Sequence, residues 1–289
     1  MAETIGFIGT GIMGQPMAAN LLAKGYAVTV YNRSADKAKT LTEQGARAAA
    51  TPKEVGQRAK VVILMLTGPE AINAILHGPD GLLAGMAKNG VVVNMSTVSP
   101  AYSKELAAQL NQQGLTFIDA PVSGSKKPAE EGALVILASG PQEVVTALEP
   151  VFLAMGKKVV SCGAAGNGSA MKMTVNLLLG AMMAGLSEAV AFGQQCGLDA
   201  ETVLDTILAG PLGCGLYTLK AEMLRTDRFP AQFPLKHMDK DLGFVLETAA
   251  AHQAKVPLAE TIHALYQQGM AMGLGDLDFA AVKKVLTSA

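Results

Sequence analysis

Short apolar runs alternate with helical patterns along the first half of the chain. The runs are rich in Val, Ile and Leu and occupy Thr4 to Ile8, Ala27 to Tyr31, Val61 to Leu66, Val91 to Met95 and Thr116 to Ile118. They lack regular polar alternation, which is typical of strands that helices cover on both faces. The pattern predicts an α/β fold with a parallel, doubly wound sheet. Val135 to Ala138 and Lys158 to Ser161 are candidate extensions of that sheet.

The second half of the chain has a helical pattern. After the glycine-rich stretch from Gly163 to Gly168, no convincing strand pattern follows. Ser169 to Gln195 carries apolar residues at three- and four-residue spacing on nearly every side, which indicates a long buried helix. We therefore predict a sheet-containing domain at residues 1–162 and an all-α domain at residues 163–289, built on that long central helix.

Composition narrows the range of partners. Half of the 289 residues are hydrophobic and 16% are charged, and the 23 Lys and Arg nearly cancel the 24 Asp and Glu, which argues against nucleic acid. Mean hydropathy is +0.30, but the most apolar runs fall short of a membrane span, so we expect a soluble protein without a membrane partner. No secretory signal pattern precedes the first strand, which predicts a cytoplasmic location. The cysteines and histidines show no metal-ligand spacing, so no metal is assigned.

A glycine turn follows the first predicted strand. Gly9, Gly11 and Gly14 have the G-x-G-x-x-G spacing between a strand and a helix pattern. The first glycine then permits a tight turn, the second lets the backbone approach a pyrophosphate, and the third lets helix and strand pack closely. The segment predicts a Rossmann dinucleotide-binding site with the turn residues Gly9, Thr10, Gly11, Ile12, Met13 and Gly14.

The end of the second predicted strand indicates which dinucleotide binds. NAD sites commonly have an acidic residue there to bind the adenosine ribose, whereas this chain has Asn32, Arg33 and Ser34. The arginine fork can pair with a 2′-phosphate, and Ser34 and Lys37 can add a hydroxyl and a charge. The pattern favours NADP over NAD. The alternative is that Arg33 is a solvated surface side chain.

Small polar residues follow three further predicted strands. Leu66 and Thr67 follow the third strand, Thr97 follows the fourth, and Asp119 to Ser125 follow the fifth. Because ligands bind beyond the carboxyl ends of parallel strands, these residues are candidates to surround one crevice. Each is also compatible with ordinary loop chemistry.

Lys172 and Asn176 lie four residues apart in the predicted long helix, which places them on one face. A lysine within the apolar stretch Met171 to Leu179 is costly to bury without a partner. We therefore expect Lys172 to border a polar cavity. The alternative is a structural lysine that extends its amine to solvent.

Four ordered motifs resemble those of the β-hydroxyacid dehydrogenases, a family that includes 3-hydroxyisobutyrate dehydrogenase and tartronate semialdehyde reductase. The motifs are Gly6 to Gly14, Asp119 to Gly124, Gly163 to Asn176 and Lys240 to Leu242. Within the family, three segments look most like glyoxylate/succinic semialdehyde reductases. They are Ser125 to Glu130, Phe233 to His237 and Gly273 to Phe279.

The resemblance implies roles for individual residues. Lys172 corresponds to the catalytic lysine, and Ser123, Gly124 and Asn176 correspond to substrate-binding residues. The implied cofactor contacts are Thr97 and Lys240, while Leu66-Thr67 replaces the Leu-Pro of many relatives and leaves the local nicotinamide contact open. The segments Ser125 to Glu130 and Phe233 to His237 lead to the hypothesis that Lys126 or Lys236 holds the distal carboxylate of a four-carbon semialdehyde.

The sequence therefore predicts an NADPH-dependent reductase of small carboxyl aldehydes, either succinic semialdehyde to 4-hydroxybutyrate or glyoxylate to glycolate. Lys172 would stabilise the developing alkoxide and protonate it as a general acid. Two alternatives remain, an NAD-linked 3-hydroxyacid dehydrogenase and a non-catalytic dinucleotide-binding module. The resemblance also suggests a homo-oligomer, a dimer or a tetramer, formed through the helical domain.

Overall fold

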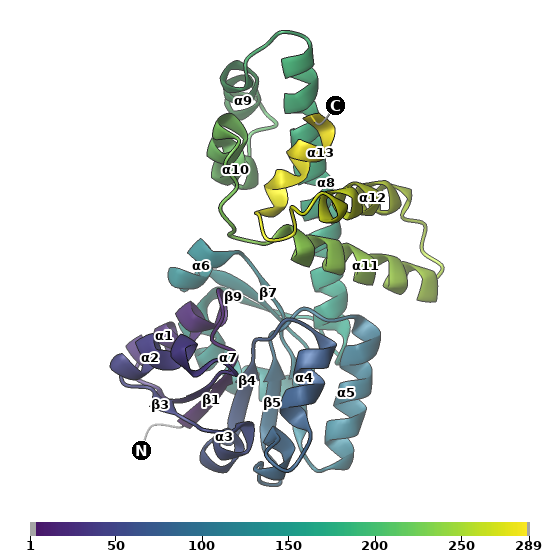
Figure 1. Cartoon of the computed structure of the whole chain (residues 1–289). Helices are drawn as coiled ribbons and strands as arrows, with labels where there is room; N and C mark the ends of the chain where they lie inside the picture. The colour runs from purple at the N-terminus through teal and green to yellow at the C-terminus, as the bar shows by residue number, and fades with distance from the viewer. Residues whose placement is uncertain (1–3, 288–289) are drawn as a thin grey trace. The chain divides into compact units, whose positions relative to one another are not determined.

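The computed structural model describes residues 4–287, and the chain divides into two compact units, Met1–Lys172 and Met173–Ala289 (Figure 1). The division falls inside helix α8 (Asn167–Gln195), which begins in the N-terminal unit and continues into the C-terminal unit. The predicted boundary at residues 162/163 lies shortly before the start of this helix. A continuous helix therefore joins the sheet-containing and the helical parts of the chain.

The N-terminal unit is built on a parallel sheet with strand order β3-β2-β1-β4-β5-β6. Its strands are β1 (Thr4–Ile8), β2 (Ala27–Tyr31), β3 (Arg47–Ala48), β4 (Val61–Leu64), β5 (Val91–Asn94) and β6 (Thr116–Asp119). The order reverses between β1 and β4, the switch point at which Rossmann sheets bind dinucleotides. The predicted fold class is confirmed, whereas β3 escaped prediction because Arg47 and Ala48 are both exposed.

Helices cover both faces of this sheet (Figure 1). Phe7 of β1 packs in one core cluster with Met17, and the adjacent Ile8 packs in another with Leu106. Successive side chains of a strand point to opposite faces, so the two buried faces explain the apolar runs without alternation. The helices are α1 (Gly14–Ala23), η1 (Ala35–Ala38), α2 (Lys39–Glu43), α3 (Pro52–Arg58), α4 (Pro69–Leu76), η2 (Leu82–Ala84), α5 (Pro100–Gln112), α6 (Lys126–Glu130) and α7 (Gln142–Met155).

The remaining strands of the N-terminal unit form a separate sheet, with β7 (Val122–Ser123) antiparallel to β8 (Leu134–Ala138) and β8 parallel to β9 (Gly156–Ser161). The prediction that the last two strands extend the parallel sheet is therefore wrong. Among residues 4–287, one isolated antiparallel bridge, between Asp119 and Ser139, joins the main sheet to this second sheet. Their backbone hydrogen bonds, of 3.0 and 2.7 Å, join β6 to the residue after β8 without a parallel ladder.

Within residues 173–287 the C-terminal unit consists of helices and connecting loops, with one isolated bridge between Pro234 and Asp278 and no strand. Its helices after α8 are α9 (Ala200–Ala209), α10 (Gly215–Thr226), α11 (Leu235–Ala251), α12 (Pro257–Ala271), η3 (Phe279–Val282) and α13 (Lys283–Thr287). Leu186 of α8, Leu242 of α11 and Tyr266 of α12 belong to one buried cluster. The predicted all-α second domain on a long central helix is confirmed.

Helix α8 differs in two ways from its prediction. Leu178 and Phe192 are 61% and 70% exposed, so the helix is not buried on nearly every side. Taken whole, it is also long and apolar enough to cross a membrane, although the shorter runs in the sequence are not. A core helix of a folded domain meets the same criterion, and the fully buried Asn176 and Ser187 show polar atoms of α8 packed within the protein.

Candidate active site

The glycine turn between β1 and α1 has a shape that glycine alone allows at two of its positions. Gly9 has φ +100°, and a Cβ there would lie 2.2 Å from the carbonyl oxygen of Met65. A Cβ on Gly14 would lie 1.8 Å from the carbonyl oxygen of Gly9, whereas Gly11 has no heavy atom near its Cβ position. The open side of the turn at Gly11 fits the close approach of a pyrophosphate, and α1 begins without a side-chain cap that would compete for the anion.

Asn32 braces this turn against the end of β2. Its Oδ1 accepts a hydrogen bond from the Thr10 amide at 3.0 Å, and its Nδ2 donates to the Ser34 carbonyl at 3.0 Å. The Gly9 amide also donates to the Tyr31 carbonyl at 2.9 Å. The side chain of Asn32 is thus engaged in shaping the turn, whereas Arg33 and Ser34 border the adjacent cavity.

That cavity has a volume of about 250 Å³, and most of the predicted cofactor residues of the N-terminal unit line it. Its lining includes Gly9, Gly11, Asn32, Arg33, Ser34, Leu66 and Thr67 from the predicted set, together with Lys37. Ala71, Ala74 and Ile75 of α4 form an apolar wall that the sequence reasoning missed. Small apolar residues one helical turn apart were the only signal for it. An apolar wall facing polar and cationic groups fits the flat base and the phosphorylated ribose of a dinucleotide.

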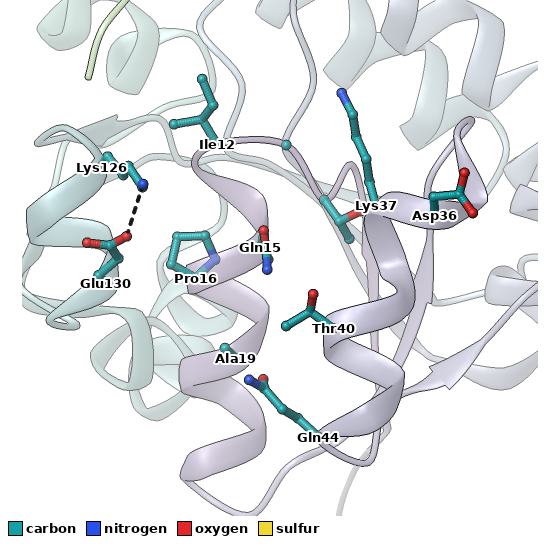
Figure 2. A pocket seen from close by; sticks show the side chains of 12 residues that line it. Ile12, Gln15, Pro16, Ala19, Asp36, Lys37, Thr40, Gln44, Lys126 and Glu130 are labelled. Atoms are coloured by element: carbon teal, nitrogen blue, oxygen red, sulfur yellow. Dashed lines mark ion pairs between the residues drawn. The ribbon is translucent and has the colours of Figure 1, made fainter. Parts of the chain in front are cut away.

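A second cavity, of about 560 Å³, lies beside the same turn and includes Thr10 and Ile12 in its lining. Figure 2 shows it between α1 and the segment from Asp36 to Gln44, with α6 on the other side. Lys126 reaches it from α6, half exposed and 3.5 Å from Glu130. Met13 and Gly14 are not among the residues that line either cavity.

The loops after β4 and β5 are tied together by buried polar groups. The Leu66 amide donates to Ser96 Oγ at 2.8 Å, and the Ser96 amide donates to Asn94 Oδ1 at 3.1 Å. Asn94 and Ser96 are fully buried. They fix the backbone next to Thr67 and Thr97. The only indication of this role in the sequence was that polar residues stand at the end of a predicted strand.

The predicted substrate residues Ser123 and Gly124 lie at the end of β7. Ser123 pairs with Val135 of β8, which fixes its place in the second sheet. Gly124 has φ +135°, and a Cβ there would lie 2.7 Å from Leu134 Cδ2. The backbone at this point can therefore take its observed path only with glycine.

Lys172 and Asn176 lie one turn apart in α8, on either side of the division between the two units. Lys172 is 7% exposed and Asn176 is fully buried. Burial of an amine within an apolar stretch requires polar surroundings. Lys172 is not among the residues that line the two cavities described above, so its place beside a polar cavity stays a prediction.

Asp241 of α11 holds two predicted site residues of the C-terminal unit. Its Oδ2 accepts a hydrogen bond from Asn176 Nδ2 at 2.7 Å, and its Oδ1 lies 3.0 Å from Lys240 Nζ. An ionised carboxylate only accepts hydrogen bonds, so it fixes which end of the Asn176 amide faces it. The other end, Asn176 Oδ1, is buried and receives no hydrogen bond from the described residues. Sequence reasoning assigned no role to Asp241, although it lies in the Lys-Asp-Leu motif.

The start of α11 carries two further basic residues. Lys236 is about half exposed and pairs with Asp276 at 2.6 Å. Burial lowers the pKa of His237, and the nearby charge of Lys240 lowers it further. His237 is therefore held towards its neutral form.

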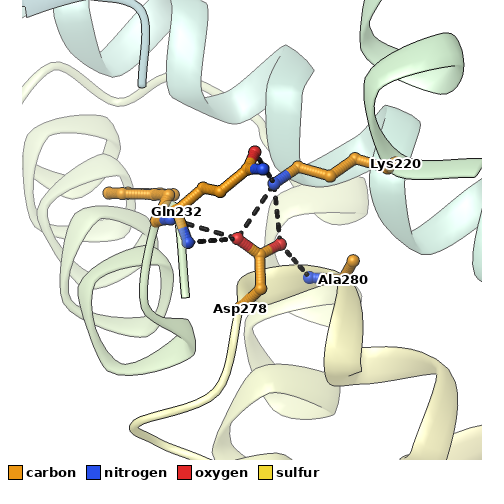
Figure 3. Close-up of polar contacts among 5 residues, drawn as sticks. Lys220, Gln232, Asp278 and Ala280 are labelled. Carbon is orange, nitrogen blue, oxygen red and sulfur yellow. Dashed lines mark hydrogen bonds and ion pairs between the residues drawn. The ribbon is translucent and has the colours of Figure 1, made fainter. Parts of the chain in front are cut away.

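A buried ion pair fixes the segment that leads into α11. Lys220 Nζ lies 2.8 and 2.9 Å from the two carboxylate oxygens of Asp278, which also accept from the amides of Gln232 and Ala280 (Figure 3). Both side chains are almost completely buried. Burial lowers the pKa of Lys220, and the charge of Asp278 opposes that shift. The pair anchors the loop before Leu235 to the segment before η3.

The parallel sheet and the glycine turn at its switch point are those of a Rossmann dinucleotide-binding domain. Residues 4–163 match the family model of the NAD binding domain of 6-phosphogluconate dehydrogenase. Residues 166–286 match the model described as NAD-binding of NADP-dependent 3-hydroxyisobutyrate dehydrogenase.

Individual relatives agree with these matches. Glyoxylate/succinic semialdehyde reductases 2 and 1 of Arabidopsis thaliana are 37% and 36% identical to the chain. The first alignment covers 99% of this chain and 80% of the relative, and the second covers 96% of each. A solved structure of 3-hydroxyisobutyrate dehydrogenase from Mycobacterium tuberculosis with L-serine is 30% identical, with a TM-score of 0.88 and full coverage of both chains. The chain belongs to the β-hydroxyacid dehydrogenase family.

Proposed function

We propose that the protein is an NADPH-dependent reductase of small carboxyl aldehydes, with succinic semialdehyde and glyoxylate as candidate substrates. The observation that carries the proposal is the buried Lys172, one helical turn before Asn176, whose amide is oriented by Asp241. A lysine kept inside an apolar helix suits a polar reaction centre better than a surface role. The likeness to two reductases named for these substrates supports the same choice.

Lys172 would act as the general acid. Reduction of an aldehyde adds a hydride to the carbonyl carbon, which NADPH supplies when bound, and a proton to the carbonyl oxygen. The Lys172 ammonium would donate a hydrogen bond to that oxygen, stabilise the negative charge that develops on it, and transfer the proton. Asn176 Oδ1 would accept a hydrogen bond at the same centre, because its Nδ2 is already engaged by Asp241.

The substrate carboxylate would bind at Ser123 and Gly124. The Ser123 hydroxyl and the backbone amides of this segment are donors for which a carboxylate is a suitable acceptor. Glycine at position 124 permits the positive φ of this segment, where a side chain would collide with Leu134. Binding of the carboxylate here would orient the aldehyde without using Lys172 for recognition.

Support for NADP over NAD comes from the cavity at the end of β2. Arg33, Ser34 and Lys37 line it, and its lining contains no acidic residue that would accept from the ribose hydroxyls. The family description that matches residues 166–286 also names an NADP-dependent enzyme. These residues would hold the 2′-phosphate by charge-assisted hydrogen bonds.

Initial rates over a panel of aldehydes test the function directly. NADPH and NADH should each be tried with glyoxylate, succinic semialdehyde and butanal, and 3-hydroxyisobutyrate should be tried with NADP and NAD in the oxidative direction. The proposal expects the highest kcat/KM with NADPH and a carboxyl aldehyde. Efficient oxidation of 3-hydroxyisobutyrate with NAD would favour the second candidate, an NAD-linked hydroxyacid dehydrogenase, for which the full-length structural match is the supporting observation.

We further propose a homo-oligomer that forms through the helical unit. Several large apolar side chains of this unit are more than half exposed, and contact with a second copy of the chain would remove them from water. They are Leu178, Phe192, Leu198, Leu212 and Leu258. Light scattering after gel filtration tests this, and a mass near 29.8 kDa would contradict it.

A further inference from the structure

A buried carboxylate lies at the start of the helix that carries Lys172. Asp119, the last residue of β6, is fully buried. Its Oδ2 accepts a hydrogen bond from the Ser169 amide at 2.8 Å, and its Oδ1 accepts from Ser169 Oγ at 2.8 Å. Ser139 Oγ adds a third hydrogen bond to Oδ2 at 3.2 Å.

The neighbouring serine completes this cap. Ser139 Oγ accepts a hydrogen bond from the Gly168 amide at 3.0 Å. The first amides of a helix have no partner within it, so Asp119 and Ser139 satisfy two amides that α8 itself leaves open. A Cβ on Gly168 would lie 2.4 Å from the Leu137 carbonyl oxygen, which shows how closely the helix start approaches the second sheet. The beginning of α8 is therefore held by side chains from outside the helix.

We propose that Asp119 is a positioning residue for Lys172, an inference that rests on the proposed role of Lys172 as general acid. Lys172 follows Ser169 by about one helical turn, so the bonds that fix Ser169 also fix the origin of the lysine side chain. Misplacement of a reacting group by about 1 Å can cost on the order of a hundredfold in rate.

The charge of Asp119 adds a second effect. The N-terminus of a helix carries a partial positive charge, which disfavours an ammonium nearby. A carboxylate at this end offsets that charge. Burial raises the pKa of Asp119, while the hydrogen bonds from Ser169 and Ser139 oppose the shift by favouring the ionised form.

Two substitutions test the proposal. Asp119→Asn keeps the shape of the side chain but removes one of the two acceptors for Ser169, and Ser169→Ala removes only the hydroxyl bond. Neither substitution touches a residue proposed to contact NADPH or the substrate. We expect the single-turnover rate and kcat to fall by about tenfold or more in Asp119→Asn, and by a smaller factor in Ser169→Ala. The aldehyde KM and the NADPH Kd should stay within about threefold.

Asp199→Asn is the matched control for loss of a cap. Asp199 accepts from the amide and the hydroxyl of Thr202, each at 2.8 Å, which is the same pair of bonds at the start of α9. Helix α9 carries no proposed site residue. This variant should lower the Tm and leave kcat unchanged, because a merely structural cap contributes to stability alone.

The outcomes separate positioning from stability. If Asp119→Asn and Ser169→Ala fold and keep kcat within about twofold of the wild type, the proposal is overturned. If Asp119→Asn does not fold, Ser169→Ala decides by the same criterion. If the wild type reduces no carboxyl aldehyde, the proposed function fails by itself. In that case the rate at which an amine-reactive reagent labels Lys172 is compared between the wild type and the two variants. A change of about threefold at Lys172, with labelling of Lys37 unchanged, supports positioning. An unchanged rate at Lys172 overturns it.

Discussion

The side-chain amide of Asn176 donates to the Asp241 carboxylate at 2.7 Å, and the same carboxylate lies 3.0 Å from Lys240 Nζ. One buried acidic residue thus orients a proposed substrate contact on α8 and holds a proposed cofactor contact on α11. The arrangement gives Asn176 a fixed direction, with its oxygen left as the acceptor. It also explains why the role of Asn176 depends on a residue far away in the sequence.

The cofactor preference should depend on Arg33. Arg33→Asp removes a charge-assisted contact to the 2′-phosphate and adds an acceptor for the ribose hydroxyls. We expect NADPH affinity to fall by about tenfold to a hundredfold, or roughly 1.5–3 kcal/mol, and preference to shift towards NADH. Arg47→Asp, at an exposed position on β3, serves as a control for net charge. Equal kcat/KM values for NADPH and NADH in the wild type would contradict the assignment.

Recognition of a distal carboxylate should involve Lys126 or Lys236. Each now pairs with an exposed carboxylate, Glu130 or Asp276, and such surface pairs contribute at most about 1 kcal/mol, so either can be exchanged for a substrate group. We expect Lys126→Met or Lys236→Met to raise the KM for succinic semialdehyde by about tenfold, with a smaller effect on glyoxylate. Steady-state kinetics of the two variants show which lysine contributes to the KM. Unchanged KM values in both variants, or equal efficiency with butanal, would rule out this recognition.

The Lys220–Asp278 pair should matter for stability. Lys220→Met leaves the buried carboxylate of Asp278 without its counter-ion, and such a loss destabilises by about 3–5 kcal/mol. The double variant Lys220→Met/Asp278→Asn should recover part of this, because the uncompensated charge is gone. Lys127→Ala, which breaks an exposed pair with Glu131, should change the free energy of unfolding by less than about 1 kcal/mol. Urea unfolding measures all three, and a Lys220→Met change as small as that of Lys127→Ala would contradict the account.

His237 should make stability depend on pH. Its pKa in the folded protein is below the ordinary value of 6.5, so the unfolded chain binds more protons as the pH falls through 6.5. The free energy of unfolding should therefore decrease as the pH is lowered below that value, and the loss should be smaller in His237→Gln. Urea unfolding at several pH values from neutral to mildly acidic provides the comparison. Parallel curves for the two proteins would show that His237 does not contribute.

The sequence predicted the local parts of the structure better than the long-range ones. β1 and the glycine turn follow from apolar runs and from spacing, because both depend on neighbouring residues. The second sheet did not follow, because β8 has the same apolar pattern as a strand of the main sheet, and its pairing with β7 and β9 depends on contacts that this pattern does not specify.

The supporting residues of the site were harder to find for a related reason. Asp241 contacts Asn176 from a distant helix, and Asp119 contacts Ser169 from the end of β6. No periodicity or spacing relates residues so far apart in the chain. The exposed face of α8 also escaped prediction, because an apolar side chain such as Phe192 has the same signal whether it is buried or on the surface.

The role of Lys172 is the central claim, and Lys172→Ala tests it. The substitution removes the proton donor and the positive charge at the carbonyl oxygen, which should lower kcat by about 10²–10⁴-fold. The proposed NADPH contacts lie on the glycine turn and at Arg33, in the cavity beside β2, so binding of the cofactor should barely change. NADPH fluorescence titration gives the Kd of the variant as its internal control.

The most direct measurement follows NADPH oxidation at 340 nm with succinic semialdehyde and glyoxylate, in the wild type and in Lys172→Ala, at saturating NADPH. The account predicts that the wild type turns over at least one of these substrates and that the variant binds NADPH with nearly the wild-type Kd but loses turnover. A variant that retains more than about a tenth of the wild-type kcat would contradict the assignment of Lys172 as the general acid.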